Sequence, residues 1–320
     1  MSLSPVPARS LRPLPDMTRP LVLVGHSAAM RRIADAITEA AELNATILIT
    51  GESGVGRRLI ARTIHDRSPR QSGPFISVNC VCLPDARLEC ELFGHAETGA
   101  PVREPWSSRG RLEAADGGTI VLQDVGYMSW RLQGRLHRFV DTRVVQRIGS
   151  SLSTPSDVRL IAIMQSSLMH TVRNRVFRDD LFSRITLIHI EVPPLRERCD
   201  DVPALFRYFM CVQAARLARP VAELTADAQS CLTEYDWPGN VRELKELAER
   251  LAETTTSDRL GVDDLPPVLV RRSMSRTMAR WNAKPSVAGR PISAVDDDDL
   301  DRRGDGHEPQ TELLLNRRED

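Results

Sequence analysis

The chain has 320 residues, no formal net charge, 41% hydrophobic residues and 27% charged residues, which is ordinary for a soluble globular protein. The neutral balance excludes a global electrostatic attraction to nucleic acid, and no run of residues is long and apolar enough to span a bilayer. The six cysteines include no Cys-x-x-Cys pair, which argues against a metal site. We therefore expect a cytoplasmic protein with reduced thiols that makes no membrane contact.

Strands and helices alternate in the pattern of residues 21–192. Residues 1–20 are rich in Pro and Arg and lack an apolar signal segment, so we expect a disordered leader there. Apolar residues at helical spacing follow, and a second amphipathic helix begins near Arg57. Short apolar runs predict strands at 45–50, 75–79, 119–123, 158–163 and 186–192. This alternation indicates an α/β fold with a parallel sheet.

The pattern changes after residue 192. Residues 193–267 are helical in pattern, without strand runs, and predict a small helical subdomain. We expect residues 268–320 to form a disordered tail, since a stretch with six basic side chains (271–290) is followed by four aspartates at 296–299. The alternative is a basic segment for nucleic acid or a partner, masked by its own acidic end.

The segment GESGVGRR at 51–58 has the frame of a phosphate-binding loop between a strand and a helix. Gly51, Gly54 and Gly56 permit backbone angles that let N–H groups converge on phosphate oxygens, and the helix start adds its positive dipole end. Arg57 stands where such loops carry lysine. The guanidinium is bulkier, planar and differently directed, so we expect weakened nucleotide binding, weakened catalysis, or both. A glycine-rich turn of purely structural use is the alternative.

Arginine is far commoner than lysine in this chain. Lys245 and Lys284 are the only lysines, so drift toward arginine is another explanation of Arg57.

A second element of a nucleotide site is expected at the end of the predicted strand 119–123. Acids at this place normally hold Mg²⁺ and polarise water. Here the polar pair is Gln123 and Asp124. Gln123 offers a carbonyl oxygen without charge, and Asp124 is the candidate either to act on water or to take over the metal.

With these motifs the chain resembles the AAA+ central domain of bacterial enhancer-binding proteins, the ATPases that remodel sigma-54 RNA polymerase. The resemblance extends from about Leu21 to Leu265. It rests on the segments LVGHSAAMRRI, ILITGESGVGRRLIARTIHDRSPR, GPFISVNC, LPDARLECELFGH, GRLEAADGGTIVLQDVG, FRDDLFSRITLIHIEVPPLRERCDDVPAL and WPGNVRELKELAER.

The resemblance implies an AAA+ P-loop core with a helical lid that uses ATP and Mg²⁺. Arg178 and Arg184 match two arginines that reach a neighbouring subunit's γ-phosphate, which implies a ring, usually a hexamer. Without the resemblance, surface ion pairs would be the favoured explanation of both arginines. Asn79 matches the residue that holds the catalytic acid away from water, and Arg242 matches the sensor of the lid. The implied nucleotide-binding residues are Gly51, Glu52, Ser53, Gly54, Val55, Gly56, Arg57, Arg58, Gln123, Gln165 and Arg242.

Four functional positions depart from the family pattern. The family has lysine at Arg57, Asp-Glu at 123–124 and a sensor asparagine at Gln165. Its sigma-54-contacting loop, Gly-Ala-Phe-Thr-Gly-Ala, is about three residues shorter here and lacks the phenylalanine. Only Thr98, Gly99 and Ala100 of that loop remain.

Three interpretations stay open. The favoured one is a sigma-54-interaction AAA+ regulator that binds nucleotide, is impaired in ATP hydrolysis and sigma-54 contact, and acts through a homo- or hetero-oligomeric ring or by occupying the polymerase. The second is an active, ATP-hydrolysing sigma-54 activator, and the third is a non-enzymatic interaction protein. Any contact with DNA is expected only through the tail or a partner.

Overall fold

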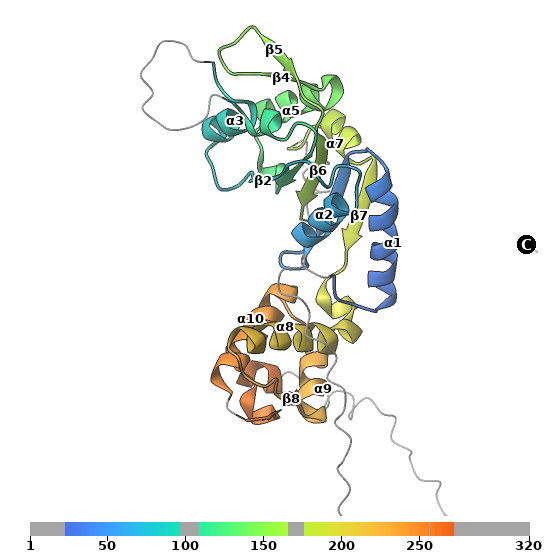
Figure 1. Ribbon diagram of the computed structural model, residues 1–320, viewed down its shortest axis with the longest axis vertical. Coiled ribbons are helices and arrows are strands. Elements are labelled where there is room, and N and C mark those ends of the chain that lie inside the picture. The colour runs from blue at the N-terminus through green and yellow to red at the C-terminus, as the bar shows by residue number, and fades with distance from the viewer. Residues whose placement is uncertain (1–22, 97–108, 166–175, 256, 272–320) are drawn as a thin grey trace, which may run out of the picture.

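The computed structural model describes residues 23–96, 109–165, 176–255 and 257–271. Figure 1 shows an α/β body stacked on a smaller helical body along the long axis. The predicted leader, residues 1–20, lies outside the described residues. Among those described, no helix has the length and apolar character needed to cross a membrane.

A five-stranded parallel sheet forms the centre of the α/β body, in the order β2-β3-β6-β1-β7. Its three central strands are almost entirely buried, as the predicted cover on both faces requires. The predicted parallel α/β fold is confirmed, and strand ends differ from the prediction by two residues at most. The strands are β1 Ile47–Gly51, β2 Phe75–Asn79, β3 Thr119–Gln123, β6 Arg159–Met164 and β7 Ile188–Val192.

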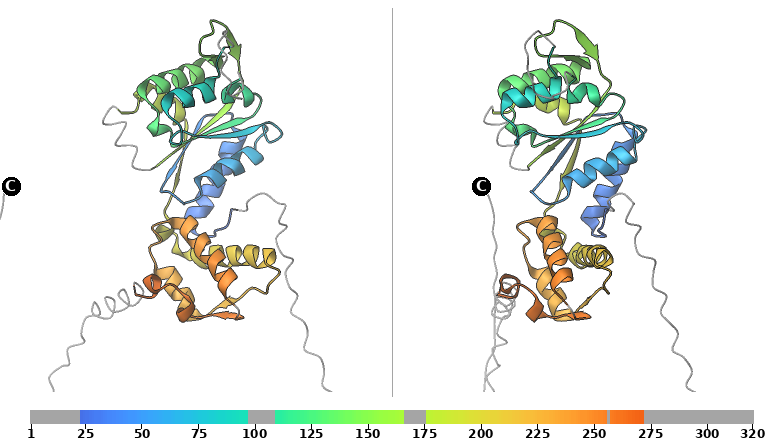
Figure 2. Two further views of the ribbon diagram at one scale, coloured as in Figure 1. Left: turned by 90° about the vertical axis from the view of Figure 1, so that its left-hand side faces the viewer. Right: turned by 60° about the vertical axis from the view of Figure 1, so that its left-hand side comes forward.

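Helices cover both faces of the sheet (Figure 2). Side chains alternate along β1, so Ile47 and Ile49 pack with α1 and α2, whereas Leu48 faces the opposite core. The first layer is α1 Ala28–Glu42 and α2 Arg57–Asp66; the second is α3 Asp85–Phe93, α4 Arg111–Ala114, α5 Trp130–Thr142 and α7 Asp179–Ile185. The turn η1, Val125–Tyr127, follows β3.

A small antiparallel hairpin extends the second layer, and sequence reasoning missed it. It pairs β4 Val144–Gln146 with β5 Ser153–Pro155. All three residues of β5 are exposed, so no apolar alternation marks the strand in the sequence.

The helical body follows Val192 and has its own core. Trp237 is fully buried in it, and its indole Nε1 donates to the carbonyl of Leu232 at 2.8 Å. The described helical residues continue to 271, beyond the predicted start of the tail at 268, because Leu269 packs into this core. Two paired strands of two residues, β8 Glu223–Leu224 and β9 Arg259–Leu260, were not predicted because they are too short to show a pattern. The remaining elements are η3 Leu195–Glu197, η4 Cys199–Asp201, α8 Val202–Arg216, α9 Ala226–Glu234, α10 Asn240–Thr254 and η5 Val262–Asp264.

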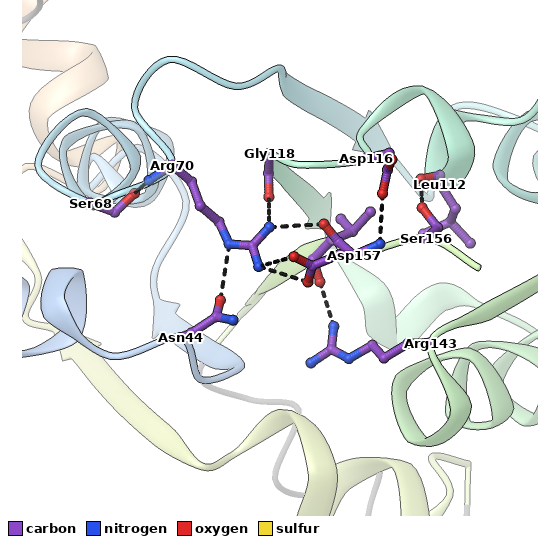
Figure 3. Close-up of polar contacts among 10 residues, drawn as sticks. Asn44, Ser68, Arg70, Leu112, Asp116, Gly118, Arg143, Ser156 and Asp157 are labelled. Atoms are coloured by element: carbon purple, nitrogen blue, oxygen red, sulfur yellow. Dashed lines mark hydrogen bonds and ion pairs between the residues drawn. The ribbon is translucent and has the colours of Figure 1, made fainter.

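Arg70 holds together the end of the sheet at which the strands begin (Figure 3). Its guanidinium binds both carboxylate oxygens of Asp157 at 2.7 Å, just before β6. The same side chain donates to Asn44 before β1 and to the carbonyl of Gly118 before β3. One arginine therefore fixes the starts of three adjacent strands. The end of the sheet at which the strands finish remains open.

Asp201 joins the two bodies. Its carboxylate is fully buried and accepts hydrogen bonds from the N–H groups of His26 and Ser27 and from the Ser27 hydroxyl, at 2.7, 2.8 and 2.7 Å. Ser27 in turn caps α1 by accepting from the N–H of Met30. The start of α1 is thus fastened to the start of the helical body.

We expect Asp201→Ala to lower the free energy of unfolding by about 2–4 kcal/mol, because it removes the shared acceptor of two N–H groups and of the Ser27 hydroxyl. Chemical denaturation followed by circular dichroism measures this loss. Asp200→Ala, at the exposed neighbouring carboxylate, is the control and should have little effect. Equal losses in the two variants would contradict the anchoring role.

Candidate functional site

The phosphate loop between β1 and α2 lies at the end of the sheet where the strands finish. Each carbonyl of residues 53–56 accepts a hydrogen bond from elsewhere in the protein. The pairs are Asn240 Nδ2 to Ser53 O at 3.0 Å, Arg242 N to Gly54 O at 3.3 Å, Arg198 Nη2 to Val55 O at 3.0 Å and Ile60 N to Gly56 O at 3.2 Å. In a trans peptide the next N–H points the opposite way from the carbonyl. The N–H groups of residues 54–57 therefore face away from these donors, and within the described chain none of them has an acceptor.

All three loop glycines are required by geometry. Gly51 has a φ of +149°, and a Cβ there would lie 2.7 Å from the carbonyl oxygen of Val192. Gly54 has a φ of +82°, and a Cβ there would lie 2.3 Å from the carbonyl oxygen of Gly239 in the helical body. Gly56 has a φ of +105° and opens onto free space. A side chain at Gly54 would therefore push the helical body away, and one at Gly56 would strain the backbone where the N–H groups converge.

A cleft of about 1000 Å³ lies between this loop, the ends of β3 and β6, and the first turns of α10. Its volume suits a nucleotide. It brings together most of the predicted nucleotide-binding residues and two of the predicted catalytic ones, Asn79 and Asp124. The nucleotide-binding residues in the cleft are Ser53, Gly54, Gly56, Arg57, Arg58, Gln123, Gln165 and Arg242. Val55 instead packs in the core, and Glu52 faces the helical body.

Arg57 turns toward the sheet. Its Nη1 donates to the carbonyl of Met164 at 2.5 Å, and its Nη2 lies 3.9 Å from Asp124 Oδ1. Burial lowers the pKa of Arg57, Asp124 partly restores it, and Arg242 lowers it further. The charge that replaces the expected loop lysine is therefore held against the end of β6 and a carboxylate.

Asp124 has an unusual backbone. Its φ of 55° is left-handed, a conformation that costs a non-glycine residue about 1 kcal/mol. The N–H of Asp124 donates to the carbonyl of Ile163 at 2.7 Å, which fixes the residue beside β6. Its Oδ1 is buried and, among the described residues, accepts no hydrogen bond. A strained position with an unsatisfied carboxylate oxygen is typical of a functional site.

The polar groups in the cleft suit phosphate oxygens better than they suit Mg²⁺. Magnesium favours carboxylate and water oxygens in octahedral arrangement. Asp124 already faces the Arg57 guanidinium, and Gln123 is neutral and donates through Nε2 to Ser77 Oγ at 2.7 Å. Nowhere in the described ranges do three His, Cys, Asp or Glu side chains gather as a metal site. The free N–H groups and nearby cations, in contrast, match a phosphate chain.

Asn79 lies beside Gln123 in the register of β2 and β3. Its Oδ1 accepts from the N–H of Val81 at 2.9 Å, and in the described part of the chain no hydrogen bond joins it to Asp124. The predicted role of Asn79, restraint of the catalytic acid, stays a prediction.

Glu52 and Arg242 connect the loop to the helical body. Arg196 binds both oxygens of Glu52 at 2.6 and 2.9 Å, and Asn240 Nδ2 donates to one of them at 3.0 Å. These hydrogen bonds, the one from Arg196 first, hold the pKa of Glu52 below its usual value. Arg242 Nη1 donates to Ser53 Oγ at 3.3 Å.

Sequence reasoning missed Lys245, which lines the cleft one helical turn after Arg242. The available signal was the spacing, because residues three apart share a face of a helix.

Arg178 and Arg184 lie outside the cleft. Arg178 precedes α7 and holds Asp180 through two hydrogen bonds of 3.0 and 2.6 Å, with its guanidinium 5.3 Å from the Trp130 ring. Arg184 Nε lies 2.8 Å from Asp141 Oδ1, and its side chain is 57% exposed. Both make the ion pairs of the alternative explanation, and their action on a neighbouring subunit stays a prediction. Thr98, Gly99 and Ala100 fall outside the described residues.

Comparison with known proteins gives a consistent result. The sigma-54 interaction domain family matches residues 23–191, and the AAA+ ATPase lid domain family matches residues 196–281. Transcriptional regulatory protein ZraR of Klebsiella oxytoca is 42% identical over 247 residues, which cover 76% of this chain and 55% of ZraR. DNA-binding transcriptional regulator NtrC of Azospirillum brasilense is 40% identical over 243 residues, covering 76% of this chain and 50% of NtrC.

Among solved structures, NtrX from Brucella abortus in complex with ATP has a TM-score of 0.72 and 31% identity, covering 81% of this chain and 62% of that chain. The chain spans about half the length of these curated relatives.

The segment behind Asn79 offers a chemical test of the structure. Burial raises the pKa of the Cys80 thiol to about 12, so the thiol stays protonated at pH 8. We expect iodoacetamide at pH 8 to modify the exposed Cys82 and Cys90 and to leave Cys80 unmodified until denaturant is added. Peptide mass spectrometry measures this. Modification of Cys80 as fast as Cys82 in the native protein would show that the segment is not packed as described.

Proposed function

Because the chain belongs to the sigma-54 interaction family of AAA+ proteins, we propose that it is a nucleotide-binding transcriptional regulator impaired in ATP hydrolysis. The observation that carries the proposal is the contrast within one cleft. The phosphate loop keeps its free N–H groups, whereas Arg57 lies 3.9 Å from the candidate catalytic acid Asp124. ATP is the proposed ligand, since the cleft has the loop and volume for it.

Hydrolysis demands groups that this cleft lacks. A carboxylate must orient and deprotonate water, and a metal and a loop cation must stabilise charge on the γ-phosphate. Asp124 is one methylene shorter than the glutamate implied at this position by the resemblance. Its carboxylate also faces a guanidinium, and Gln123 brings no charge for a metal. We therefore expect nucleotide to bind without efficient turnover.

Ring assembly is the proposed mode of action, with copies of itself or with an active paralogue. Arg178 and Arg184 lie on the surface next to α7, where a neighbouring subunit can reach them. Surface ion pairs contribute little to stability, so exchange of Asp180 or Asp141 for a neighbour's phosphate costs little. The proposed target is sigma-54 RNA polymerase in the cytoplasm, with weakened contact because the loop around Thr98 lacks its aromatic residue. DNA is contacted only through the tail or a partner.

Turnover assays on the purified chain test the impairment. We expect fluorescent ATP analogues to bind while phosphate release stays at background. Combined replacement of Arg57→Lys, Gln123→Asp and Asp124→Glu should raise phosphate release by about 100-fold, since it restores the base and the charges for the γ-phosphate.

The contrary outcome is wild-type ATP turnover that disappears in Asp124→Ala. That result would establish the chain as an active ATPase and therefore as the alternative, an active sigma-54 activator. Absence of any nucleotide binding would favour the non-enzymatic interaction protein.

The donated arginine is tested in rings mixed with an ATP-hydrolysing family member. We expect Arg178→Ala in this chain to lower the mixed ring's ATPase rate at least tenfold relative to wild type, because the neighbour's γ-phosphate loses a cation. Arg216→Ala, at an exposed arginine of α8, is the matched control. An unchanged rate with Arg178→Ala, in rings that co-purify normally, would contradict the donated-arginine role.

A further inference from the structure

The side chains of the cleft are strongly unbalanced in charge. Among the described residues that line it, Asp124 is the sole carboxylate. Five cationic side chains line the same space: Arg57, Arg58, Arg62, Arg242 and Lys245. An excess of this size points to an anion with several charges.

These cations differ in whether an acidic side chain of the protein compensates their charge. Arg57 faces Asp124, and Arg62 binds Asp66 at 2.8 Å, so their charges are compensated within the protein. Among the described residues, the guanidinium of Arg242 donates only to the neutral Ser53 hydroxyl.

The side chain of Arg58 is exposed and, in the described ranges, its guanidinium forms no hydrogen bond or ion pair. Lys245 lies 3.6 Å from Glu249, which does not line the cleft.

The first turns of α10 place two of the cations near the loop. The N–H of Arg242 donates to the carbonyl of Gly54, which fixes the start of this helix against the phosphate loop. Lys245 lies on the same helical face, three residues later. Positive charge therefore enters the cleft from the lid, whereas Asp124 lies at the end of β3.

The cleft offers few ligands to a divalent metal ion. Magnesium bound with phosphates needs one or two carboxylates in addition to phosphate and water oxygens. The single candidate, Asp124, has Arg57 as its charged neighbour, and a second cation there would be repelled. The amide of Gln123 supplies no compensating charge.

We propose that this cleft binds a nucleoside di- or triphosphate as the metal-free anion, with Arg242 and Lys245 supplying the positive charge that Mg²⁺ commonly supplies to phosphates. The inference rests on the proposed nucleotide binding and goes beyond it in naming the charge state of the ligand and Lys245 as a ligand residue. It also gives a second reason for slow hydrolysis, since the ion that bridges phosphates during transfer is not recruited.

Calorimetric titration of the purified chain with ATP and with ADP tests this, once in EDTA and once in excess MgCl₂. We expect the Kd in EDTA to be equal to or lower than that in MgCl₂. Lys245→Gln should weaken binding in EDTA about tenfold, because one charge-assisted contact to phosphate is lost. Arg250→Gln, five residues further along α10 and outside the cleft, should leave the Kd unchanged.

Restoring a carboxylate at position 123 should reverse the preference for metal-free nucleotide. We expect the double variant Arg57→Lys, Gln123→Asp to bind ATP at least tenfold more tightly with MgCl₂ than with EDTA, since a carboxylate pair is then available to the metal. Its circular dichroism spectrum serves as the folding control.

Three distinguishable results would overturn the proposal or part of it. Wild-type binding that is tenfold or more weaker in EDTA would reject metal-free binding and leave nucleotide binding intact. No heat of binding in either buffer, confirmed with a fluorescent ATP analogue, would reject both. An equal Kd for Lys245→Gln and wild type in EDTA would remove Lys245 from the site.

Discussion

The orientation of the peptide planes in the phosphate loop is the constraint on which the cleft depends. Residues 53–56 direct their carbonyls toward donors from α2, the lid and the segment before it. Two of the four donors, Asn240 and Arg242, belong to α10, so docking of the lid helps to hold the loop in this form. The anion-binding face is therefore a property of two bodies, and the Asp201 anchor that joins them supports the site from a distance.

The altered residues change the chemistry of the cleft without disturbing this scaffold. Arg57 finds an acceptor in the carbonyl of Met164, and its other nitrogen lies near Asp124, so the larger side chain is accommodated at the end of the sheet. The result is a site in which the catalytic side is neutralised within the protein and the lid side stays positive. Under the proposed function, binding and turnover depend on different parts of the cleft, so nucleotide binding can be kept while hydrolysis is lost.

Much of the scaffold could be predicted from the sequence, because buried parallel strands and a glycine loop leave strong local patterns. The apolar runs of β1, β3 and β6 and the helix after Gly56 are of this kind. The direction of the Arg57 side chain could not be predicted, since its acceptor at Met164 lies 107 residues away in the chain. The exposed strand β5 left no hydrophobic signal, and Lys245 belongs to the cleft only through docking of α10.

The contact of Glu52 with Arg196 and Asn240 has a thermodynamic consequence. The loop and the lid share these hydrogen bonds, so a ligand that alters the loop also alters the docking equilibrium of the lid. Linkage makes such an effect reciprocal. A neighbouring protein that clamps the lid would then change the affinity of this cleft for its anion by the same factor by which the anion changes the affinity for that neighbour. Under the proposed function, a chain without turnover would in this way still transmit the occupancy of its cleft to a neighbouring subunit.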